Sequence, residues 1–115
     1  MATDKTFKYG ELEREFDLLD YVCTERWETA LEQLGLANTE AAAQERDSAK
    51  VKGLVLAIYA FYDNVLGEGS AKLALGGTTR LEDALDAAAK LVAFVEAQGA
   101  ALENKYSTYL PKSKK

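Results

Sequence analysis

The feature that most limits the fold is a glycine-rich stretch in the middle of the chain, between two long segments with helical apolar periodicity. Gly67 and Gly69 lie in its first half, and Gly76–Gly77 in its second half. Glycine adopts positive φ without the penalty that a Cβ brings, so it commonly follows the last residue of a helix. We therefore expect Gly67 to end one helix, Ser70 to cap a short turn over 71–75, and the next glycines to end that turn.

Phosphate binding is the functional alternative for so many glycines, but neither nucleotide-binding template fits. No Lys-Ser or Lys-Thr pair follows the glycines, and Lys72 stands where G-x-G-x-x-G needs its third glycine. Thr79 and Glu82 have the spacing of a capping box, which predicts the start of another helix. We interpret the stretch as a helix-to-helix connection.

The charge and the missing residue types exclude several function classes. The chain has 115 residues, a formal net charge of -5, no histidine and one cysteine. The acidic balance disfavours nucleic acids and anionic membranes as partners. Without histidine, the usual general base and the usual zinc ligand are missing. Cys23 cannot form an internal disulfide, which favours a reducing, intracellular setting, and no run is apolar for long enough to span a bilayer.

Residues 6–18 fit two structures. Thr6–Tyr9 alternates like a strand and Gly10-Glu11 can turn the chain, whereas Leu12, Phe16 and Leu19 also have helical spacing. We expect a short β-hairpin. Because an isolated hairpin is marginal in water, it has to lay its aromatic side chains on the helices or pair with another chain.

Two helices are predicted before the glycines. The first runs from Tyr21 to about Leu34, with Asp20 as its N-cap and Gly35 as its end. The second begins at Asn38 or Thr39 and has an apolar stripe in its second half. That stripe consists of Val51, Leu54, Val55, Ile58, Tyr62 and Val65. Gly53 interrupts it, and a close approach of two helix backbones would explain a glycine there.

The third long helix is expected over about 80–104. Its predicted apolar stripe consists of Leu81, Leu85, Ala88, Val92 and Val95, widened by Leu91, Phe94 and Leu102. Tyr106 and Tyr109, with Leu110, form an apolar group beyond it that could fold back or dock on a partner. The fold class is thus mainly α, with three main helices in a small bundle, an N-terminal β-hairpin and one extra helical turn. We expect one domain over 1–110 and a basic, disordered tail over 111–115.

No arrangement of residues predicts catalysis, a cofactor or a metal. Glu82 and Asp86 share a helix face, but a hard cation needs more oxygen ligands than this pair supplies. Asp63 and Arg80 are expected to form an ion pair. Ser48 follows an aspartate, as the modified serine of acyl carrier proteins does, yet the glycine of that pattern is replaced by Glu45 and Ser48 falls inside a predicted helix.

The run Phe61-Tyr62-Asp63-Asn64-Val65-Leu66-Gly67-Glu68-Gly69-Ser70-Ala71, followed by Gly76-Gly77 and Leu81, resembles a motif of small helical proteins. These proteins are encoded by phages and prophages of Gram-positive bacteria, often among tail-morphogenesis genes. The similarity covers most of the chain up to about Phe94. The structural loop motif that it marks comprises Phe61, Asp63, Gly67, Glu68, Gly69, Gly76 and Gly77.

The resemblance implies a non-enzymatic tail assembly factor in the cytoplasm of the bacterial host. It would chaperone the tape-measure protein, whose long helices aggregate before the tail tube covers them. The alternative is a structural virion component, such as a tail or head–tail completion protein. Either could be a homo-oligomer. The aromatic residues considered for partner binding are Trp27, Tyr62, Tyr106 and Tyr109, and for Trp27 core packing is the competing interpretation.

Overall fold

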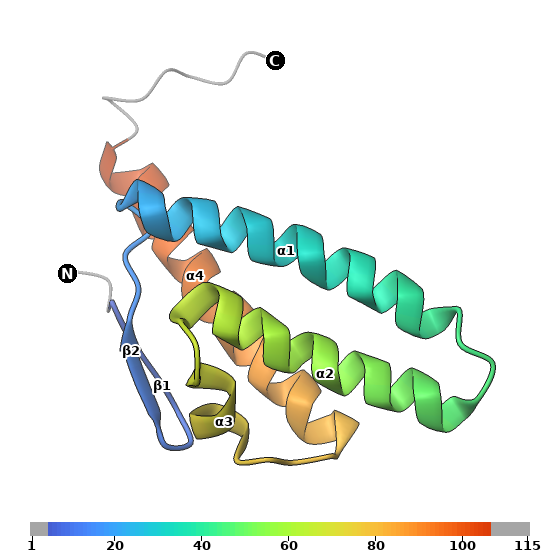
Figure 1. Ribbon diagram of the computed structural model, residues 1–115. Coiled ribbons are helices and arrows are strands. Elements are labelled where there is room, and N and C mark those ends of the chain that lie inside the picture. Colours follow the sequence, from blue (N-terminus) through green and yellow to red (C-terminus); the bar gives the residue numbers. More distant parts are fainter. Residues whose placement is uncertain (1–4, 107–115) are drawn as a thin grey trace, which may run out of the picture.

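A β-hairpin and three long helices dominate the chain (Figure 1). The computed structural model describes the backbone of residues 5–106 and the side chains of residues 5–101. In order, the elements are β1 (Thr6–Tyr9), β2 (Leu12–Glu15), α1 (Tyr21–Ala42), α2 (Asp47–Leu66), α3 (Ser70–Leu75) and α4 (Leu81–Tyr106). This confirms a mainly helical fold with an N-terminal hairpin and a short helix among the glycines. None of the described helices combines the length and apolarity needed to cross a membrane.

The hairpin lies on the helices and does not stand alone. Its strands pair antiparallel, with Tyr9 opposite Leu12, and the face that carries Phe7 and Leu12 is buried. The Phe7 ring lies 5.2 Å from the Phe94 ring of α4, measured between centroids. These contacts supply the burial that a two-stranded hairpin lacks by itself. The helical alternative for this segment was wrong.

The tip of the hairpin is fastened to α3. Gly10 has a φ of 59°, and a Cβ there would lie 2.6 Å from the carbonyl oxygen of Ala74. The next residue, Glu11, donates its backbone N–H to the carbonyl of Leu73 at 3.0 Å. Only glycine allows both the conformation and the close approach, so this turn joins β1–β2 to the glycine-rich region.

Helix α1 is longer than the sequence predicted. Asp20 does cap it, accepting from the N–H of Val22 at 3.0 Å, but Gly35 does not end it. The helix continues to Ala42, and Thr39 donates its hydroxyl to the carbonyl of Gly35 inside α1. A helical hydroxyl can bond the carbonyl four residues back, so Thr39 does not cap a second helix. A glycine inside a helix costs only about 1 kcal/mol, which packing against α2 offsets.

The chain reverses between Ala43 and Arg46, and α2 returns along α1 (Figure 1). The two helices approach each other closely at Gly53, where a Cβ would lie 2.8 Å from the Cβ of Ala41. The predicted reason for a glycine at this position is therefore confirmed. Further along, α2 buries Val55, Ile58, Tyr62 and Val65 in the core.

Helix α4 buries a face that only partly coincides with the predicted stripe. Its buried side chains are Ala84, Ala87, Leu91, Val95 and Gln98. Leu91 and Val95 of the stripe are thus in the core, Leu81, Ala88 and Val92 pack half-buried against it, and Leu85 is exposed. Tyr62 of α2 donates its hydroxyl to the carbonyl of Ala87 at 2.6 Å. Such an approach to the α4 backbone requires small side chains at the contact, which Ala84 and Ala87 provide.

Candidate functional site

The first half of the loop motif connects α2 to α3. Gly67 ends α2 with a φ of 106°, as predicted, and its N–H donates to the carbonyl of Asp63 at 3.0 Å. Phe61 is buried in the core, whereas Glu68 and Gly69 are exposed in the turn. Gly76 and Gly77 have positive φ and end α3.

Asp63, and not Ser70, caps α3. The Asp63 carboxylate accepts a hydrogen bond from the N–H of Ala71 at 2.9 Å. The Ser70 hydroxyl is fully buried and has no hydrogen-bond partner among the described residues. The expected ion pair between Asp63 and Arg80 does not form, because the carboxylate serves α3 and Arg80 binds acids of α4.

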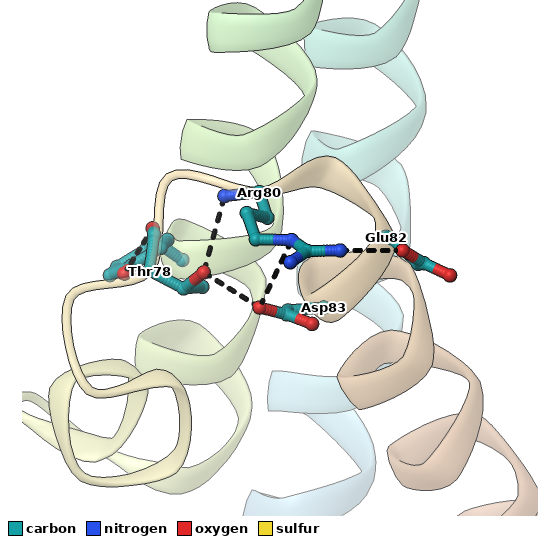
Figure 2. A network of polar contacts seen from close by, with 5 residues as sticks. Thr78, Arg80, Glu82 and Asp83 are labelled. Atoms are coloured by element: carbon teal, nitrogen blue, oxygen red, sulfur yellow. Dashed lines mark hydrogen bonds and ion pairs between the residues drawn. The ribbon is translucent and has the colours of Figure 1, made fainter.

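Arg80 and the start of α4 form a polar network on the surface (Figure 2). The Thr78 hydroxyl accepts from the N–H of Arg80 at 3.2 Å and donates to Asp83 at 2.9 Å. The Arg80 guanidinium lies 2.8 Å from Glu82 and 3.9 Å from Asp83. The predicted capping box of Thr79 and Glu82 is therefore wrong: the cap is one residue earlier and its acid one residue later. Tyr59 holds the loop by donating to the Thr78 carbonyl at 2.9 Å.

Asp86, the next acidic residue along α4, is also hydrogen-bonded. Asp86 accepts from the Tyr9 hydroxyl at 2.6 Å, which ties the hairpin to α4. That hydrogen bond, followed by burial and the charges of Asp86 and Asp83, raises the pKa of Tyr9 to about 12. Within residues 5–101, no group of three or more potential metal-binding side chains gathers. The pair Glu82 and Asp86 thus has other partners, one in Arg80 and one in Tyr9.

The aromatic residues considered for partner binding take different places. Trp27 is half-buried, with its ring 5.5 Å from Phe61 and 6.4 Å from Phe16, so most of it is core. Tyr62 is fully buried, and burial raises its pKa. It has no surface to offer a partner, which corrects that expectation. Tyr106 is the last residue of α4, its side chain lies outside the described part, and Tyr109 lies outside it entirely.

A shallow cleft of about 470 Å³ lies between α1 and the end of α2, largely open to solvent. Its lining is mostly polar: Val22, Glu25, Arg26, Thr29, Gln33 and Asn64. The only hydroxyl group in the lining is that of Thr29. The charged groups beside it, on Glu25 and Arg26, are exposed to solvent, so neither is a base that could activate the hydroxyl as a nucleophile. This cleft is a poor candidate for chemistry.

One side of α4 is a candidate binding surface because the fold covers it only in part. Leu81, Leu85, Ala88 and Val92 recur at helical spacing and share one face, which we call the open apolar face. Leu85 is 53 % exposed, whereas Leu81, Ala88 and Val92 are half-buried and pack against the edge of the core. The sequence analysis assigned all four to the core; Leu81, Ala88 and Val92 do pack against it, but Leu85 does not.

The sequence matches the model of a known protein family. The profile described as "Family of unknown function (DUF6673)" matches residues 10–115, which is nearly the whole chain. No curated protein and no solved structure matches.

Proposed function

We propose a function for this chain, which belongs to the DUF6673 family: it is a non-enzymatic assembly factor that binds a helix of another protein. The observation that carries the proposal is the open apolar face of α4. An exposed leucine between half-buried apolar side chains on one helix face is a surface on which an amphipathic helix of another protein can pack. The partner helix would place its own apolar residues at matching intervals along α4.

The free energy available from burying the open apolar face is small, as reversible binding requires. Full burial of one leucine side chain contributes about 1.5–3 kcal/mol, and Leu85 still has about half of that burial to gain. Leu81 and Val92 are already half-buried and would add less. An interface that buries only a few such side chains has modest affinity, so the partner can dissociate. An assembly factor that is absent from the final particle needs this reversibility.

The resemblance of the loop motif to small phage proteins supports a more specific identity. On that basis the partner is a tail protein, with the tape-measure protein as the first candidate, and the place of action is the cytoplasm of the bacterial host. The helical character of the partner fits the open apolar face. The lack of histidine in the chain and the engaged acids at the start of α4 support a role without catalysis.

The test is co-purification with a soluble tape-measure segment encoded beside this gene, comparing two variants. Leu85→Lys places a charge on the open apolar face, whereas Leu56→Lys changes a leucine of α2 that is equally exposed, at 53 %. We expect Leu85→Lys to weaken binding by at least about tenfold, because each 1.4 kcal/mol corresponds to a factor of ten. Leu56→Lys should bind like the unchanged protein. If both variants bind the segment equally well, the open apolar face is not the binding surface.

The same system separates the assembly factor from the alternative, a structural component of the virion. Purified particles should lack the protein if it acts only during assembly. Its presence at a fixed ratio to the tube protein would favour the structural component.

A further inference from the structure

The outer face of α1 combines unpaired negative charge with exposed apolar side chains. Tyr21, Glu25, Glu28 and Glu32 recur at helical spacing and all point away from the core. None of the three glutamates has an ion-pair partner among the described residues, where the pairs involve Lys5 and Arg80. Glu28 and Glu32 are four residues apart, and like charges at this spacing repel. A cation beside this row would relieve that repulsion.

The start of this face is apolar. Leu19, Tyr21 and Val22 are 55, 74 and 48 % exposed, an unusual concentration of uncovered apolar surface within four residues. Gln98 of α4 contacts the chain just before this patch, since it accepts from the N–H of Leu18 at 2.9 Å and donates to the carbonyl of Phe16 at 2.7 Å. Helix α4 continues for eight more residues to Tyr106, and Figure 1 shows its last turns near the start of α1.

The segment 107–115 has the composition that would complement this face. It contains Tyr109 and Leu110, then Lys112, Lys114 and Lys115, and no acid. Pro111 disfavours helix at the residue before it, so the segment is suited to lie extended. Nine extended residues reach about 30 Å, whereas the rise along α1 from Tyr21 to Glu32 is about 16 Å. The length, the order of apolar and basic residues, and the starting point all match.

We propose that the segment 107–115 docks along the outer face of α1 in the same molecule. Tyr109 and Leu110 cover Leu19 and Tyr21, and the lysines lie along the row of glutamates. The sequence analysis expected a disordered basic tail over 111–115, and docking would replace that expectation. The proposal does not depend on the function proposed above, because the outer face of α1 shares no residue with the open apolar face.

The experiment is paramagnetic relaxation in the full chain. A nitroxide is attached at Ser113→Cys after Cys23→Ala has removed the native thiol. We expect strong broadening of the amide signals of Glu25, Glu28 and Glu32, and none at Lys72 in α3. Glu25→Gln, Glu28→Gln and Glu32→Gln together should abolish the broadening. The matched triple Glu11→Gln, Glu13→Gln and Glu15→Gln, which removes as many exposed charges from the hairpin, should leave it unchanged.

The salt dependence and the comparison of copies show whether the broadening comes from an electrostatic contact within one molecule. Raising the salt from about 0.1 M to about 1 M shortens the Debye length from about 10 Å to about 3 Å and should reduce the broadening. Broadening at α1 no stronger than at Lys72 would overturn the proposal. It would also be overturned if the effect arises only when the label and the observed amides are on different copies, since the segment would then join two molecules.

Discussion

The close contact between α1 and α2 at Gly53 predicts that substitution by alanine has opposite effects at two helical glycines. Gly35 and Gly53 both lie inside helices, and alanine gains about 1 kcal/mol over glycine in a helix interior. At Gly35 a Cβ would meet no atom within 4 Å, so Gly35→Ala should raise the free energy of unfolding by up to about 1 kcal/mol. At Gly53 the added Cβ would lie 2.8 Å from the Cβ of Ala41.

Neither partner in that second contact can move without its helix, because both atoms are Cβ atoms attached directly to the backbone. Forcing extra volume into such a contact costs about 1–3 kcal/mol, which exceeds the helical gain over most of that range. We expect Gly53→Ala to lower the free energy of unfolding by up to about 2 kcal/mol. Ala41→Gly in the Gly53→Ala background should remove the contact and recover the overpacking cost, though it introduces a new helical glycine.

The assay is urea denaturation of the wild type, the two single variants and the double variant, with the slope m checked for constancy. The difference in unfolding free energy between Gly35→Ala and Gly53→Ala isolates the overpacking cost, since the helical gain is common to both. If both single variants stabilise the protein equally, the close approach of α1 and α2 is wrong.

Three other predictions follow from single contacts. Asp63→Ala removes the acceptor for the N–H of Ala71 and should cost about 1 kcal/mol in urea denaturation, with faster amide exchange confined to α3 at first. Ser70→Ala removes a buried hydroxyl without a partner and should raise the unfolding free energy by about 1 kcal/mol; a loss would show that the hydroxyl is satisfied. The pKa of Tyr9 is raised from its usual 10 to about 12, so its contribution to stability is complete below pH 10 and is lost as the pH rises through 12. Asp86→Asn should return that pKa toward its usual value, as followed by the ring carbon-13 shift of Tyr9, and an unchanged pKa would contradict the contact.

Features that depend on a few neighbouring residues were predictable from the sequence. The alternation of Thr6–Tyr9 and the Gly10 turn identified the hairpin, and Asp20 and Gly67 marked one helix start and one helix end. In each case the signal and the structure it specifies lie within one turn of chain. The three long helices were found for the same reason, because their periodicity is local.

Features that depend on contacts between distant segments were not predictable. Gly35 would be a helix end in an isolated peptide, but packing of the following turns against α2 keeps α1 helical to Ala42. Asp63 could be assigned to α3 only once the turn at Gly67 had folded the chain back, which brings the carboxylate to a residue eight positions later. The candidate site also depends on contacts between distant segments, because the rotation of α4 about its axis decides which of its side chains are exposed.

The orientation of α4 is set by polar contacts rather than by apolar content. Turning α4 to bury Leu85 would complete the burial of one leucine at the expense of Leu91, which is fully buried now. It would also break the hydrogen bond from Tyr62 to Ala87 and both bonds of Gln98, and it would leave those buried groups without partners. Each such loss costs about 1–3 kcal/mol, as much as burying a leucine contributes. The open apolar face is thus held outward by the same contacts that order the core, so a partner helix meets a surface that needs no rearrangement before binding.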